Sequence, residues 1–276
     1  MGLRPAAVAG SWYPGQPQQL TAELEQHLAA ATLPELPGRL VALIAPHAGL
    51  RYSGPVAAYT YKVLRGRRRL TAFLVGPAHR VSFRGVSVWG TGAFETPLGV
   101  VPVDEAAAAR LVSADPMIVD SPRPHRDEHS LEMQLPFLQH VVPEVSIVPV
   151  LMGSQERHEV EALAAALVAA ARGRDGAVLV ASSDLSHYEP AAVANELDAL
   201  VVGDVERLDP ESLMARLESS RGHACGGGPM VAVMKAARAL GAARATVLRY
   251  ADSGDVAGGD KSRVVGYMAA ALTAPS

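Results

Sequence analysis

Cysteine is almost absent from this chain, whose 276 residues include only one, Cys225. A single cysteine excludes an intrachain disulfide, so cysteine usage gives no support to secretion. The first fifteen residues, MGLRPAAVAGSWYPG, also lack the continuous apolar run of a signal peptide. We therefore expect a cytoplasmic protein.

Long apolar runs and a strong net charge are missing as well. No segment reaches the roughly 18 uninterrupted apolar residues of a membrane span, so we expect no membrane insertion. The formal net charge of −3 at pH 7 argues against an overall attraction to nucleic acid. One local exception is the basic run RGRRR, Arg65–Arg69. We interpret it as a solvated helix end, with contact to phosphate or nucleic acid as the alternative.

Apolar residues are abundant, and they follow two alternating patterns. Short runs rich in β-branched residues predict buried strands at 40–45, 71–76, 146–151, 177–181, 245–250 and 263–269. Alanine-rich runs predict helices at 17–31, 54–65, 104–112, 130–140, 156–171, 190–206, 210–219 and 229–240. The alternation indicates an α/β fold with a central, largely parallel or mixed sheet and helices on both faces.

The stretch 86–103 departs from this alternation. Its short strand-like pieces are interrupted by glycine and proline, which predicts a hairpin near the edge of the sheet. No linker, repeat or low-complexity tail divides the chain. We therefore expect a single domain over residues 1–276.

Two histidines follow two of the predicted strands in the same way. LVALIAPHAG places His47, and TAFLVGPAHR places His79, after an apolar run and a turn that contains proline. Ligands of open α/β sheets bind outside the carboxyl ends of the strands. A lone histidine there is more often a hydrogen-bonded structural residue, but the repeated arrangement favours a shared metal or catalytic site.

Three more residues stand where they can reach the same edge of the sheet. Asp184 and His187, in SSDLSHY, follow a further strand and are spaced for proton transfer, although Asp184 is also a plausible helix N-cap. Cys225 precedes the helix start GGGP, where the free N–H groups of a helix end lower a thiol pKa. The alternative for Cys225 is a small buried apolar residue.

The remaining histidines carry weaker signals. His129, in RDEHSLEMQLPFL, begins a helix with a buried face, so it suits a pocket and a capping or exposed position about equally. Four others stand in no such context, and we predict surface positions for them: His27, His140, His158 and His223.

Eight segments spread over nearly the whole chain resemble the Memo family, whose bacterial and archaeal branch is called AmmeMemoRadiSam system protein B. The matching segments, in the order of the family, are AGSWYP, APHAGLRYSGPVAA, GPAHR, FETPLG, DEHSLEMQLPFL, SSDLSHY, GHACGGGP and YADSGDVAGGDKSRVVGY. The resemblance implies the fold of class III extradiol dioxygenases. It also implies radical-SAM and AMMECR1-like proteins as partners.

The same resemblance assigns roles to the residues singled out above. It makes His47, His79 and Cys225 metal ligands, gives His187 the acid/base position, and places Asp184 and His129 along the pocket. Members of the family are linked to iron and copper. The dioxygenases have a carboxylate where this chain has Cys225, and that departure puts ring cleavage itself in doubt.

Our leading hypothesis is a non-haem iron oxidoreductase, dioxygenase-like, that acts on a small molecule or a peptide. Imidazole and thiolate ligands suit copper and zinc as well, so the metal remains open. One alternative is a non-catalytic module that binds a metal or a peptide. The other is a hydrolase with Cys225 as nucleophile and His187 as base.

Overall fold

The structure, a computed structural model, describes residues 2–220 and 222–275. Its centre is a run of four parallel strands in the order β2 (Arg39–Ala45), β9 (Ala177–Ser182), β3 (Arg69–Pro77) and β8 (Glu144–Met152). These strands are almost continuously apolar and buried, because helices cover both of their faces.

Antiparallel strands extend the sheet on both sides. Beyond β2 lies β12 (Val264–Ala274), which also pairs with β10 (His187–Glu189) and β11 (Arg244–Asp252). Beyond β8 lies β4 (Val86–Val88), followed by β7 (Ile118–Asp120). The predicted mixed α/β sheet is confirmed.

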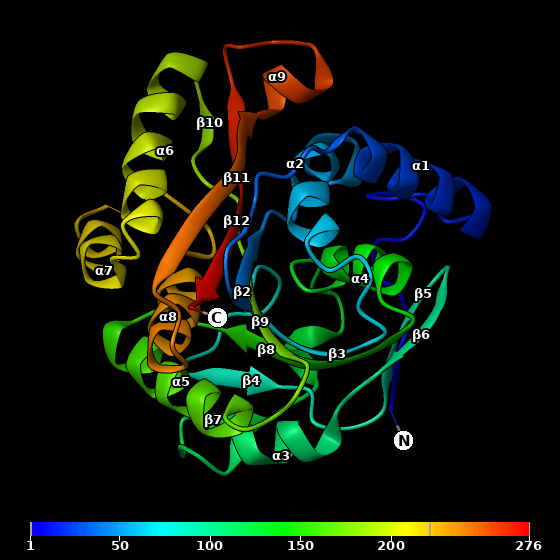
Figure 1. The fold of residues 1–276 in the computed structure, drawn as a ribbon, viewed down its shortest axis with the longest axis vertical. Coiled ribbons are helices and arrows are strands. Elements are labelled where there is room, and N and C mark those ends of the chain that lie inside the picture. The colour runs from blue at the N-terminus through cyan, green and yellow to red at the C-terminus, as the bar shows by residue number, and fades with distance from the viewer. Residues whose placement is uncertain (1, 221, 276) are drawn as a thin grey trace.

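The helices form one layer on each face of the sheet (Figure 1). One layer contains α1 (Pro17–Ala30), α2 (Leu50–Lys62) and α4 (Leu135–Val141). The other contains α3 (Glu105–Val112), α5 (Arg157–Ala171), α7 (Pro210–Ser219) and α8 (Gly227–Ala239). Helix α6 (Ala191–Glu206) packs on β11 and β12, and the short α9 (Ser253–Ala257) follows β11. Within the described residues, no helix is both long and apolar enough to cross a membrane.

The predicted hairpin is only partly correct. β5 (Ala93–Thr96) and β6 (Gly99–Pro102) do form a hairpin, but it pairs with β1 (Leu3–Arg4) in a separate three-stranded sheet. The first part of the stretch, β4, instead lies inside the main sheet between β8 and β7. Glycine and proline mark turns locally, whereas the choice of partner strand depends on distant segments.

Two helix starts also differ from the prediction. Helix α2 begins at Leu50, four residues early, and Gly54 lies inside it where a Cβ would come within 2.9 Å of His27 and Leu50. The predicted helix 130–140 is a 3-10 turn at Glu132–Gln134 followed by α4, whose first turn contains Pro136. In the second segment, Gln134 donates to the hydroxyl of Ser182, the last residue of β9, at 2.8 Å.

Candidate metal centre

Three parallel strands present their next residues at one edge of the sheet. His47, His79 and Asp184 each lie two positions beyond the end of β2, β3 and β9. Since β9 lies between β2 and β3, these three residues come from adjacent strands. The prediction that the strand ends bring them to a common edge is confirmed.

His129 joins His47 and His79 in a compact cluster. One ligand atom from each of the three lies within 4.8 Å of the other two. The ring centroids are 5.2 Å apart for His47 and His79, 5.5 Å for His47 and His129, and 4.5 Å for His79 and His129. His47 and His129 are buried, and the side chain of His79 is 30 % exposed. Three converging imidazoles are a donor set that suits zinc, copper, iron and nickel.

The hydrogen bonds of Ser182 determine the tautomer of His47. The Ser182 hydroxyl donates to the Ser130 carbonyl at 2.6 Å and accepts from Gln134 Nε2 at 2.8 Å. Its single proton is therefore used, so the 2.8 Å contact with His47 Nδ1 has the imidazole as donor. The lone pair of His47 is left on Nε2.

Glu128 fixes His79 in a comparable way. Its carboxylate contacts His79 Nδ1 at 2.9 Å and also accepts the backbone N–H groups of His79, His129 and Ser130. Burial alone would raise the pKa of Glu128, but the hydrogen bonds from His79 outweigh it and lower that pKa. An ionised carboxylate only accepts, so His79 Nδ1 donates and its Nε2 keeps the lone pair. Carboxylate–histidine pairs of this kind orient metal ligands.

His129 is held by packing more than by hydrogen bonds. Its ring centroid lies 4.2 Å from that of Trp12. Its buried Nδ1 lies 3.4 Å from Glu128 Oε1 and has no hydrogen-bond partner within residues 2–220 and 222–275. Burial lowers the pKa of His129 to about 4, and burial also lowers that of His47. Both imidazoles are therefore neutral near pH 7, the form that binds a metal.

Cys225 reaches the cluster at its edge, with its Sγ 3.2 Å from His47 Nε2. The expected lowering of the thiol pKa by the helix end is wrong for the protein without a metal. Burial raises the pKa of Cys225, and the nearby Asp184 raises it further. The dipole of α8 does not overcome the loss of hydration around the thiol.

Asp184 and His187 do not form the pair that their spacing suggests. Asp184 Oδ1 accepts the backbone N–H of His47 at 2.7 Å, and burial raises the pKa of Asp184 to about 7. His187 Nδ1 instead contacts the Leu185 carbonyl at 2.7 Å, and no Asp184–His187 hydrogen bond occurs in the described part of the chain. Because a carbonyl only accepts, His187 Nδ1 donates and Nε2 carries the lone pair.

A buried ion pair supports the loop that carries Glu128 and His129. Arg4 bonds Glu132 Oε2 at 2.6 Å, the His125 carbonyl at 2.6 Å and the Glu128 carbonyl at 2.5 Å. Arg4 and Glu128 could not be singled out from the sequence, because neither follows one of the apolar runs that predict strands. For Glu128, the available signal was its position directly before His129 in the sequence.

A cavity of about 440 Å³ has Cys225 in its wall. Met214 and Leu217 of α7 and Gln155 also line it. Gln155 donates to the Cys225 carbonyl at 2.8 Å and accepts the N–H of Gly228 at 2.7 Å, which ties the cavity to the start of α8. The cavity volume is in the range of small-molecule sites.

One surface prediction is wrong and another is correct. His158 is exposed, whereas His223 is buried, with 6 % of its surface accessible. His27 and His140 lie between these extremes. Two residues later in the same loop, Cys225 contacts His47.

Comparison with known proteins identifies the family of this chain. A family model described as "Memo-like protein" matches residues 4–271. A MEMO1 family protein of Methanopyrus kandleri is 39% identical over 96% of this chain and 97% of its own length. A MEMO1 family protein of Methanothermobacter thermautotrophicus is 37% identical over 96% of this chain and 98% of its own length.

A solved structure shows the fold independently. The crystal structure of an uncharacterized protein from Escherichia coli K12 superposes with a TM-score of 0.54 at 17% sequence identity. The match covers 85% of this chain and 100% of that one. At this identity the likeness concerns the fold alone, whereas the family match over nearly the whole sequence identifies the chain as a member of the Memo family.

Proposed function

We propose that this protein is a metal-dependent oxidoreductase that uses non-haem iron in a dioxygenase-like manner. The observation that carries the proposal is the orientation of His47 and His79. Each imidazole donates through Nδ1 to a fixed acceptor, so both rings carry their lone pair on Nε2, where a metal can bind. The Cys225 Sγ lies 3.2 Å from His47 Nε2.

The residues present fit a metal ion. The buried Nδ1 of His129 has no hydrogen-bond partner among the described residues and lies 3.4 Å from Glu128 Oε1, and a buried polar atom without a hydrogen bond is costly unless something binds near it. His47 and His79 would hold the ion together with a third donor, Cys225 or His129. Iron bound there would supply redox chemistry and free coordination positions for oxidant and substrate.

The other residues of the site have tasks of their own. His187, with its Nε2 lone pair, would accept a proton from the substrate and return it later. Asp184 holds the backbone of His47 and so positions the imidazole. Trp12 covers His129 and limits the access of water to that side of the cluster.

Elemental analysis of protein purified without oxygen tests the proposal. We expect about one iron per chain in the unaltered protein. We expect none in His47→Ala, because this variant loses one of the proposed metal ligands. His158→Ala, an exposed histidine outside the cluster, is the matched control and should keep the metal. Full iron occupancy in His47→Ala would contradict the ligand assignment.

Two further variants separate the possible third donors. If Cys225 is a ligand, Cys225→Ser should lower the metal content more than His129→Ala does. The reverse order would assign the third position to His129. Copper or zinc in place of iron would retain the metal site and refute the iron assignment.

A Cys–His hydrolase is the second candidate, and the 3.2 Å contact between Cys225 Sγ and His47 Nε2 favours it. In that arrangement His47, and not His187, would be the base. The raised pKa of Cys225 counts against it, because the thiolate is the nucleophile. Activity that survives chelators but not thiol alkylation would support the hydrolase.

A further inference from the structure

A second cavity lies at the opposite end of the same parallel strands. It has a volume of about 570 Å³, and its wall includes the first residues of β2 and β9 and the ends of α5 and α8. Four arginines contribute to its lining: Arg39, Arg67, Arg172 and Arg174. The only carboxylate among the lining residues is that of Asp175. This local excess of positive charge contrasts with the net charge of −3 for the chain.

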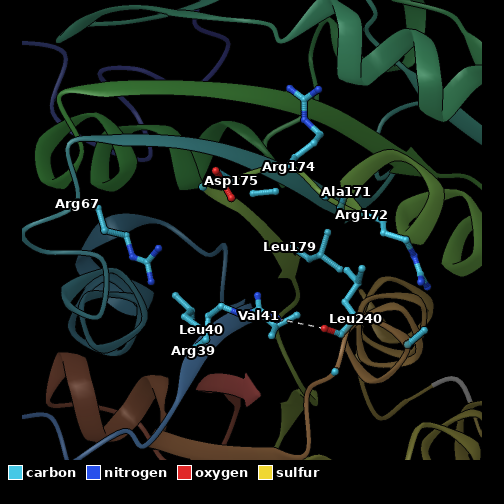
Figure 2. Close-up of a pocket in the computed structure, with 15 residues that line it drawn as sticks. Arg39, Leu40, Val41, Arg67, Ala171, Arg172, Arg174, Asp175, Leu179 and Leu240 are labelled. Carbon is cyan, nitrogen blue, oxygen red and sulfur yellow. Dashed lines mark hydrogen bonds between the residues drawn. The ribbon is translucent and has the colours of Figure 1, made fainter. Parts of the chain in front are cut away.

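Figure 2 shows how these side chains lie. The guanidinium of Arg67 reaches towards the middle of the cavity, and Arg172 lies on the opposite side with its guanidinium directed away from Arg67. Arg174 is turned away from the cavity as well, towards Asp104 outside it. Arg39 donates to the Leu240 carbonyl at 3.3 Å. Asp175 lies across from Arg67.

The basic run identified in the sequence divides into two kinds of arginine. Arg65 pairs with Glu25, while Arg68 and Arg69 both pair with Glu144. Arg67, which faces the cavity, has no ion pair within the described residues, and the same holds for Arg172. The interpretation of the basic run as a solvated helix end accounts for the arginines that form ion pairs. It gives no reason for the orientation of Arg67 towards the cavity.

Capping of helix ends explains only part of the cluster. Arg39 bonds a carbonyl at the end of α8, where a positive charge is favourable. Arg174 is already paired with Asp104. Arg67 and Arg172 remain as two unpaired guanidinium groups beside a cavity whose floor, Leu40, Val41 and Leu179, is apolar.

We propose that this cavity binds a small phosphorylated molecule, with its phosphate on the guanidinium group of Arg67. Guanidinium groups match phosphate oxygens in bidentate hydrogen bonds. A volume of about 570 Å³ suits a small molecule, and the apolar floor provides a surface for its organic part. The site is separate from the metal centre, because the full length of the strands lies between them.

Calorimetric titration with inorganic pyrophosphate, and then with ATP, tests this site. We expect pyrophosphate to bind, and Arg67→Gln to weaken it by about tenfold, the effect of losing one charge-assisted hydrogen bond. Arg68→Gln is the matched control: it removes the same charge from the neighbouring residue, whose side chain is 86 % exposed and already paired with Glu144. Asp175→Asn should tighten binding, because it removes the carboxylate across from Arg67.

Two controls make the result decisive. The first control repeats the titration in His47→Ala, where we expect the pyrophosphate affinity to be unchanged. An unchanged affinity excludes the possibility that pyrophosphate binds to a metal at the histidine cluster. The second control compares ATP with pyrophosphate and so tests the apolar floor. Tighter binding of ATP indicates that its adenosine part contributes to affinity, whereas equal affinities indicate that only the phosphates are recognised. Either outcome supports a phosphate site.

The proposal is overturned by any of three results. The first is that neither pyrophosphate nor ATP binds at millimolar concentration. The second is that Arg67→Gln and Arg68→Gln weaken binding equally, which indicates diffuse electrostatic attraction. The third is that Arg67→Gln lowers the midpoint of thermal unfolding without changing affinity, which makes Arg67 a structural residue only.

Discussion

The two ends of the parallel strands are built on opposite principles. At the carboxyl end, the polar groups around His47 and His79 are buried and bonded to one another, so each imidazole has one orientation. At the amino end, Arg67 and Arg172 are long side chains without fixed partners. A metal needs donors at fixed positions, whereas an anion can be bound by charges that adjust to it. The contrast indicates different ligands at the two ends.

Loss of the metal should have the largest effect. A metal that binds only the folded protein stabilises it by about 3 kcal/mol when its free concentration is about a hundred times its dissociation constant. Chelation should therefore lower the midpoint of thermal unfolding of the unaltered protein and leave that of His47→Ala unchanged. Equal shifts in the two proteins would show that the chelator acts elsewhere.

Glu128→Gln should have the next largest effect. It removes the charge that fixes His79 and that accepts several backbone N–H groups, and loss of such an orienting carboxylate lowers metal affinity by roughly 10- to 100-fold. Competition with a chelator of known affinity measures this change. Glu25→Gln is the matched control, since Glu25 contacts His140 at 2.9 Å in an exposed histidine–carboxylate pair. If both variants retain full metal affinity, metal binding does not depend on the carboxylate that orients His79.

Ser182→Ala should act more weakly on the same end. It removes the acceptor of His47 Nδ1–H and leaves Gln134 Nε2 with one partner fewer, but the burial of His47 and its backbone bond to Asp184 remain. We expect metal affinity to fall by about tenfold and the free energy of unfolding to fall by about 1–3 kcal/mol. Chemical denaturation of the metal-free protein measures the stability change separately. A gain in metal affinity would show that Ser182 does not set the tautomer of His47.

The smallest expected effect is coupling between the two ends. The seven residues of β2 alone span roughly 20–25 Å, and no charged group is shared by the two sites. Loading the protein with metal should therefore change pyrophosphate affinity by less than about twofold, in paired titrations of metal-free and metal-loaded protein. A larger change would mean that the ends are linked through the sheet.

Most of the sheet and its helices could be predicted from the sequence. The strands β2, β3, β8 and β9 are continuous apolar runs, and such runs become buried in whatever sheet forms. What could not be predicted was the separation of β4 from the hairpin that follows it, because pairing in a sheet joins segments far apart in the chain. The same holds for β1, a two-residue strand that has no periodicity of its own.

The candidate site divides in the same manner. The sequence by itself determined that His47, His79 and Asp184 would each follow the end of a strand, because an apolar run and its turn are local features. Only the tertiary structure decided that His129 joins His47 and His79, that Glu128 holds His79, and that Asp184 bonds the backbone of His47 instead of His187. The reason is physical: hydrogen bonds extend only about 3 Å, so which donor meets which acceptor is fixed once the layers have packed.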